Sequence, residues 1–206
     1  MDNELILSNI IGEIYDCALN PGLWTSALAD IAKFINTKAA IINVVCPIPG
    51  QKPIQSLFDF GLPDTAGKIY FEKYAKIDPM VHAGKLYDTD EVFTAREAVG
   101  EDYWTKTRMY TEWNMHFGLT EHLSGIIRKD AIRVGALSLL RDAPFGDAER
   151  DRLRLFLPHI RRSISIAKIL DEKTVERDRL IEIIDHLLAA VFIVDSTGYI
   201  LSLIHI

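Results

Sequence analysis

Apolar side chains recur every three or four residues near the start of the chain, which is the spacing of amphipathic helices. The first run covers residues 3–19 and ends at a helix-breaking NPG sequence, and the second covers residues 24–35. Residues 38–46 are short, apolar and rich in β-branched side chains, so they predict a buried strand. Residues 54–60 follow across a loop and predict its hairpin partner.

The middle of the chain continues this mixed pattern of helices and strands. A helix is predicted from residue 64 to 76, and it ends before Pro79 because the residue preceding a proline avoids the helical conformation. A second helix is predicted over residues 107–118, and its final glycine is expected to cap it. The segments EHLSGIIRK and IRVGALSLLR then predict two strands joined by a turn.

A long helix is predicted from about Phe145 onward. Its apolar residues fall three or four apart from Leu153 to Leu170, and the spacing continues weakly to Leu187. Pro158 lies within this run and is expected to kink the helix or remove one hydrogen bond. The helix is too long to close one small domain, so it predicts a connector that suits a short dimeric coiled coil. We therefore expect a homodimer formed through this helix.

The chain ends in a strand, a turn and a second strand, written LLAAVFIVDSTGYIL. This segment resembles the opening hairpin of a PAS domain. A C-terminal strand that pairs back on the first domain is the alternative. The last six residues, LSLIHI, can be back-translated to CTG TCT CTT ATA CAC ATC, the transposon end used in sequencing adapters. We therefore expect residues 189–200 to begin a PAS-like domain that is cut off, and residues 201–206 to be a non-native, adapter-encoded tail.

Composition narrows the class of protein. The chain has 206 residues, 49% of them hydrophobic and 25% charged, as in ordinary globular domains. The net charge of −6 gives no overall positive field that would attract nucleic acid. Two cysteines, Cys17 and Cys46, are too few for a disulfide framework, and the N-terminus lacks the features of a signal peptide. We expect a cytoplasmic protein that does not cross a membrane.

No common catalytic or nucleotide-binding motif occurs in the sequence. Glu112 and His116 lie four residues apart on one predicted helix, but such a pair is more often a surface contact than a metal site. The arginines of ERDRLRLFLPHIRR are interleaved with Glu149 and Asp151, which favours a solvated helix face over an anion-binding patch. The sequence therefore predicts no enzyme activity, no metal and no cofactor.

The most suggestive stretch is IYFEKYAKIDPMVHAGK, where aromatic residues precede an Asp-Pro pair. A helix carrying Tyr70, Phe71 and Tyr74 could form one wall of an apolar pocket, and Asp78 could accept a hydrogen bond from a ligand amide. The alternative is that the aromatics are ordinary core and that Asp78 caps the turn beginning at Pro79. The residues alone favour this alternative.

The same stretch resembles the Tyr-rich, Asp-Pro segment of the sensory domains of LuxR-type transcriptional regulators. The segment DCALNPGLWTSALADIAKFINTKAAII resembles the entry of these domains, and the chain from TRMYTEWNMHFG to LPHIRR resembles their second half. The resemblance covers about residues 10–170. It implies an α/β fold of GAF- or PAS-like type: an α/β/α sandwich with a central antiparallel sheet, followed by a long connecting helix and an incomplete β-hairpin.

The resemblance also implies a ligand site. Quorum-sensing members of the family carry a Trp thirteen residues before the Asp and a Tyr nine residues before it, whereas this chain has Thr65 and Ile69 there. An acyl-homoserine lactone is therefore not implied, and the small-molecule ligand is left unnamed. The candidate ligand-binding residues are Tyr70, Tyr74, Asp78, Val81, Phe93 and Trp104.

The expected organisation follows from the resemblance. Residues 1–170 form a GAF-like sensor and dimerisation domain, residues 171–188 a connecting helix, and residues 189–200 the start of the PAS-like domain. We expect the sensory fragment of a transcriptional regulator, which binds DNA only through an absent C-terminal helix-turn-helix. The alternatives are a sensor module with a kinase or cyclase output, or a stand-alone interaction domain.

Overall fold

The computed structural model describes residues 3–46, 54–185 and 191–204 of the chain. Their contacts divide the chain into two compact units, Met1–Ile164 and Ser165–Ile206. The first unit contains the sheet and helices that form the candidate site, and the second contains the later part of the long helix and a small hairpin.

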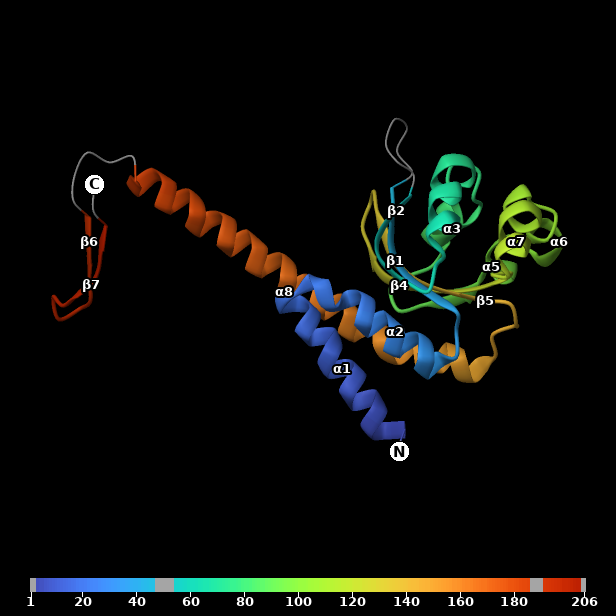
Figure 1. Ribbon diagram of the computed structural model, residues 1–206, viewed down its shortest axis with the longest axis horizontal. Coiled ribbons are helices and arrows are strands. Elements are labelled where there is room, and N and C mark those ends of the chain that lie inside the picture. Colours follow the sequence, from blue (N-terminus) through green and yellow to red (C-terminus); the bar gives the residue numbers. More distant parts are fainter. Residues whose placement is uncertain (1–2, 47–53, 186–190, 205–206) are drawn as a thin grey trace. The chain divides into compact units, whose positions relative to one another are not determined.

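A five-stranded antiparallel sheet forms the middle layer of the first unit (Figure 1). Its strand order is β2-β1-β5-β4-β3, so both predicted strand pairs are confirmed. Strand β3 was not predicted, because three residues are too few to show an alternating pattern. The strands are β1 (Ala39–Val45), β2 (Ile54–Phe60), β3 (Val92–Thr94), β4 (Glu121–Lys129) and β5 (Val134–Arg141).

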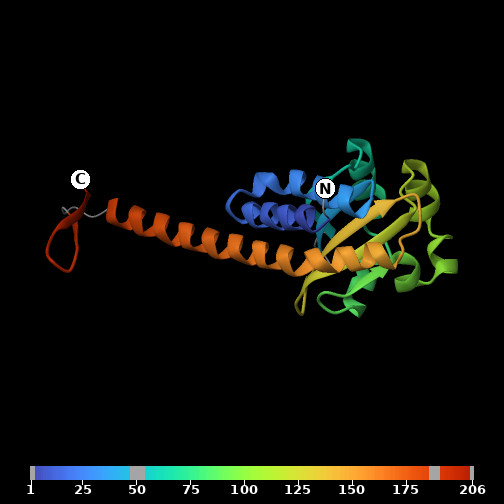
Figure 2. The ribbon, with the colours of Figure 1, turned by 90° about the horizontal axis from the view of Figure 1, so that it is seen from below.

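Three helices cover one face of this sheet: α1 (Asn3–Leu19), α2 (Trp24–Ile35) and the first part of α8 (Asp147–Asp185). Figure 2 shows the first part of α8 running along the sheet beside α1 and α2. Their apolar stripes meet the sheet in one core, which contains the fully buried side chains of Leu28 and Phe156. The helical spacing of the apolar residues therefore identified this layer correctly.

Shorter helical segments cover the opposite face of the sheet (Figure 1). The predicted helix over 64–76 is an α-helix that continues as a π-helix, and the predicted helix over 107–118 is mostly π-helical, with Gly118 as a left-handed cap at φ 64°. These segments are α3 (Asp64–Ile69), a π-helix (Tyr70–Tyr74), α4 (Met80–Ala83), a 3₁₀ turn (Gly84–Leu86), α5 (Ala95–Val99), α6 (Glu101–Trp104), a second π-helix (Met109–Asn114) and α7 (Met115–Phe117). The predicted three-layer α/β/α sandwich is thus confirmed.

The second unit holds the rest of α8 and a hairpin of β6 (Val191–Val194) and β7 (Ile200–Ile204). The α8 helix continues through Pro158, so this proline does not end it. The predicted strand–turn–strand pattern is confirmed, and its turn is closed by Asp195 Oδ1, which accepts hydrogen bonds from two backbone N–H groups. Residues 186–190, at the predicted junction of connector and hairpin, and residues 205–206 of the predicted tail lie outside the described part.

Candidate functional site

A cavity of about 100 Å³ lies between the sheet and the layer of short helical segments. We call the sheet residues that line it the floor and the helical residues the roof. The lining is mostly apolar and includes Ile41, Met109 and Trp113. A concave apolar site with a few polar groups is the usual form of a small-molecule site.

Strand alternation determines which residues form the floor. Successive side chains of a strand point to opposite faces of the sheet. On β1, Ala40 and Ile42 therefore join the core beneath α1, α2 and α8, whereas Ile41, Asn43 and Val45 line the cavity. A polar residue at position 43 consequently faces the cavity and not the large core.

Four polar side chains cross the floor from β2 to β4, and we call them the serine row: Ser56, Asn43, Ser138 and Ser124. Asn43 pairs with Ser56 in register, and Ser124 pairs with Ser138. The Asn43 Nδ2 group donates to Ser138 Oγ at 3.0 Å, and the hydroxyls of Ser138 and Ser124 lie 3.2 Å apart. The Ser56 hydroxyl is buried and has no hydrogen-bond partner among the described residues.

Asp78 is the carboxylate of the roof, and it is 6% exposed. Its Oδ2 accepts a hydrogen bond from the Tyr70 hydroxyl at 2.7 Å, and its Oδ1 accepts one from the Met80 backbone N–H at 2.8 Å. Burial raises the pKa of Asp78 to about 6, although both hydrogen bonds oppose this rise. Burial and the neighbouring Asp78 charge likewise raise the pKa of Tyr70.

The two π-helical segments carry much of the roof. Tyr70 and Trp113, one from each segment, line the cavity with their ring centroids 5.7 Å apart. The segments are also joined by a hydrogen bond from the Tyr74 hydroxyl to Glu112 Oε2, and Trp113 Nε1 donates to the backbone carbonyl of Ala66. Short π-helical insertions occur frequently at functional sites, where they change the direction of side chains.

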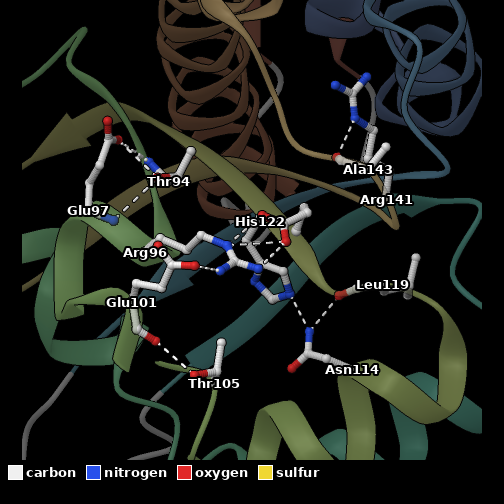
Figure 3. Close-up of polar contacts among 11 residues, drawn as sticks. Thr94, Arg96, Glu97, Glu101, Thr105, Asn114, Leu119, His122, Arg141 and Ala143 are labelled. Atoms are coloured by element: carbon white, nitrogen blue, oxygen red, sulfur yellow. Dashed lines mark hydrogen bonds and ion pairs between the residues drawn. The ribbon is translucent and has the colours of Figure 1, made fainter. Parts of the chain in front are cut away.

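His122 lines the cavity from the start of β4 and is 7% exposed. Figure 3 shows Asn114 between His122 and Leu119. The Asn114 Nδ2 group lies 2.5 Å from His122 Nε2 and donates to the Leu119 carbonyl at 2.6 Å. Burial lowers the pKa of His122 to about 4, so the ring is neutral near pH 7 and its Nε2 accepts the hydrogen bond from Asn114.

Arg96 and Glu121 form a two-pronged ion pair next to His122 (Figure 3). The Arg96 guanidinium also contacts Glu101, and Glu121 is 6% exposed. Among the described residues that line the cavity there is no lysine or arginine. The nearby positive charge of Arg96 is therefore neutralised outside the cavity.

The structure places three of the six predicted site residues in the cavity lining: Tyr70, Asp78 and Phe93. The other three are buried outside the lining. Tyr74 binds Glu112, Val81 packs in a cluster with Phe93, and Trp104 lies edge-on to His122 with ring centroids 5.1 Å apart.

Sequence reasoning missed the serine row, His122 and Trp113. A signal existed for one member of the row, because Asn43 is the single polar residue of the otherwise apolar strand β1. In the described part of the chain, no group of three metal-binding side chains comes together, and no helix has the length and apolarity to span a membrane.

No protein-family model and no curated protein matches the chain. Solved structures do match it. The VqsR LBD domain from Pseudomonas aeruginosa is 16% identical, with a TM-score of 0.63 over 78% of this chain and 94% of that chain. The LuxR-family transcription factor CepR2 from Burkholderia cenocepacia is 17% identical, with a TM-score of 0.52 over 77% of this chain and 93% of that chain. The phycoerythrobilin-bound GAF domain of a cyanobacterial phytochrome is 12% identical, with a TM-score of 0.52 over 83% of this chain and 98% of that chain.

The fold is GAF-like. This finding confirms the fold class that the sequence resemblance implied. The match to CepR2 further shows that a LuxR-family regulator shares this fold. At these low identities the similarity establishes the fold, whereas function has to be argued from the cavity.

Proposed function

We propose that this chain is the sensory part of a LuxR-type transcriptional regulator and that its cavity binds a small molecule. The observation that carries the proposal is the mostly apolar cavity with a few polar groups, which are Asp78 with Tyr70 on the roof and the serine row with His122 on the floor. The similarity to the VqsR LBD domain and to CepR2, which is described as N-acylhomoserine lactone dependent, supports it. Lack of a catalytic arrangement of side chains in the cavity agrees with a binding role.

The proposed organisation keeps residues 1–170 as the sensor, residues 171–188 as a connector, and residues 189–200 as the start of a PAS-like domain. We place DNA binding in a helix-turn-helix outside these 206 residues, in a cytoplasmic protein. Ligand binding would then act by changing the preferred orientation of α8, as expected when a ligand binds one of two conformations more tightly.

We also propose that α8 joins two copies of the chain. Four apolar side chains on its charged later part are between 39% and 57% exposed: Ile166, Ile169, Leu170 and Val175. Their spacing is not a strict heptad, but exposed apolar side chains on an otherwise charged helix form a surface suited to association. A second copy of the same helix would cover them.

Thermal unfolding in the presence of a metabolite panel tests ligand binding. A ligand at one hundred times its dissociation constant is expected to add about 2.7 kcal/mol to the unfolding free energy. Ala136→Leu adds bulk to the floor and is expected to abolish the rise in Tm caused by any hit. Ala148→Leu, on the exposed first turn of α8, is the matched control. Hits that stabilise the Ala136→Leu variant equally would contradict binding in the cavity.

A further inference from the structure

Ser56 is unusual among the residues of the floor. Its hydroxyl is buried, it lines the cavity, and no group in the part of the chain that the structure describes forms a hydrogen bond with it. A buried hydroxyl without a partner costs about 1–3 kcal/mol of stability. Alanine at this position would avoid the cost. The simplest physical reason for a serine here is therefore that its hydroxyl forms a hydrogen bond with a molecule from outside the chain.

The neighbouring polar groups do not supply that partner. Asn43 pairs with Ser56 in register, but its amide nitrogen donates across the sheet to Ser138. The Ser138 hydroxyl also lies beside that of Ser124, on the far side of the row from Ser56. Side-chain hydrogen bonds therefore connect the serine row from β1 to β4. The Ser56 hydroxyl, at the β2 end of the row, has no partner among the described residues.

The charges around the cavity limit what the partner can be. Within the described lining no cationic side chain faces the cavity, and Arg96, which lies next to His122 (Figure 3), is bound to Glu121 and Glu101. A ligand carboxylate or phosphate would thus be buried without a counter-charge, which is strongly unfavourable. A cationic group would meet one carboxylate, Asp78, which already accepts two hydrogen bonds.

The size of the cavity limits the ligand as well. At about 100 Å³ it is smaller than an engineered apolar cavity of ~150 Å³ that binds benzene. The part of the ligand that enters without movement of the roof is therefore a short chain or a small polar head.

We propose that Ser56 is a ligand-binding residue whose hydroxyl forms a hydrogen bond with an uncharged polar group, such as an amide, ester, ketone or alcohol, on the molecule that occupies the cavity. This inference rests on the proposed function of the cavity as a ligand site. It adds the chemical class of the ligand and a recognition residue on β2.

Four five-carbon probes test the class of ligand: pentanamide, 1-pentanol, pentanoate and pentylammonium, each at about 10 mM and pH 7, with Tm as the readout. The two uncharged probes are expected to raise Tm in a concentration-dependent way, and the two charged probes are not. No rise with any of the four contradicts both the inference and the proposed function. An equal rise with charged and uncharged probes contradicts the inference alone.

Ser56→Ala tests the residue. Without probe, its Tm is expected to be unchanged or higher than that of the natural chain, because a hydroxyl without a partner has been removed. The dissociation constant for pentanamide is expected to rise about five- to tenfold, the value of one hydrogen bond. A purely structural serine would show the reverse pattern, with a lower Tm and unchanged affinity.

Ser26→Ala, on the exposed face of α2, is the matched control and is expected to change neither quantity. Unchanged pentanamide affinity in Ser56→Ala, with binding intact in the natural chain, overturns the role of Ser56 and leaves the ligand-binding cavity standing.

Discussion

At the scale of single residues, two buried titratable groups of the cavity, Asp78 and His122, have pKa values shifted in opposite directions. The pKa of Asp78 rises from 3.8 to about 6, and that of His122 falls from 6.5 to about 4, both because burial disfavours the charged form. The stabilising contribution of protonated Asp78 is fully present below pH 3.8 and is lost as pH rises through 6. The contribution of neutral His122 is fully present above pH 6.5 and is lost as pH falls through 4.

The two contributions therefore oppose each other between pH 4 and 6, and each is worth about 3 kcal/mol. Asp78→Asn removes the first and leaves the second. We expect the variant to lose stability on acidification from pH 6.5 to 4 more steeply than the natural chain, by up to about 3 kcal/mol. Urea unfolding at several pH values measures this difference. Asp102→Asn, at an exposed carboxylate, is the control, and parallel curves for Asp78→Asn and the natural chain would refute the argument.

Asp78 also shows what the sequence could and could not reveal about the site. The sequence left two roles open, a helix cap or a pocket carboxylate. The structure shows a carboxylate that caps Met80 with one oxygen and accepts the Tyr70 hydroxyl with the other, while lining the cavity. The row as a whole could not be predicted, because the residues of neighbouring strands that come together are known only once the register between the strands is known.

At the scale of elements, the docking of α8 on the sheet depends on a glycine. A Cβ atom added to Gly125 of β4 would lie 2.7 Å from Leu157 Cδ1, and Leu157 is fully buried on α8. A methyl group at this position would push the helix and the strand apart. The absence of a side chain at Gly125 therefore allows the close contact between the two elements.

Gly125→Ala is expected to lower the unfolding free energy by about 1–3 kcal/mol through this overpacking. Gly12→Ala is the matched control, because nothing lies within 4 Å of the added Cβ and the residue is exposed within α1. Alanine there should stabilise the chain by about 1 kcal/mol through its helix propensity. Chemical denaturation of both variants gives the comparison, and equal effects at the two positions would argue against tight packing of α8 on β4.

The elements that were predicted correctly are those in which the apolar pattern repeats over many residues. The stripes of α1, α2 and α8 and the apolar runs of β1, β4 and β5 bury large surfaces, so their patterns are visible in the sequence. The π-helices at Tyr70–Tyr74 and Met109–Asn114 were read as ordinary helix, because one wider turn barely alters a short apolar pattern. Tertiary contacts across the roof, such as Tyr74 with Glu112, accompany them.

At the scale of the whole molecule, the change from buried to exposed helix coincides with the boundary between the units. Ile164 packs against the core of the first unit, whereas the larger apolar side chains that follow, Ile166, Ile169, Leu170 and Val175, are exposed. The first unit thus contains a complete core and the whole cavity. We infer that the sensor folds without the second unit and that the exposed stripe serves association of two copies.

Two altered chains test this division. A chain ending at residue 165, which lacks all four exposed apolar side chains of α8, is expected to keep its Tm within a few degrees, because the unit of Met1–Ile164 retains its core, but to sediment as a monomer. The full-length Ile169→Lys, Val175→Lys variant should also be monomeric with little change in Tm, since both side chains are already exposed. Lys168→Ala, on the same helix, controls for the loss of an exposed side chain. Sedimentation velocity measures the mass of each chain.

A dimer that survives the paired lysine substitutions would exclude α8 as the interface. A natural chain that is itself monomeric at all concentrations would exclude the homodimer.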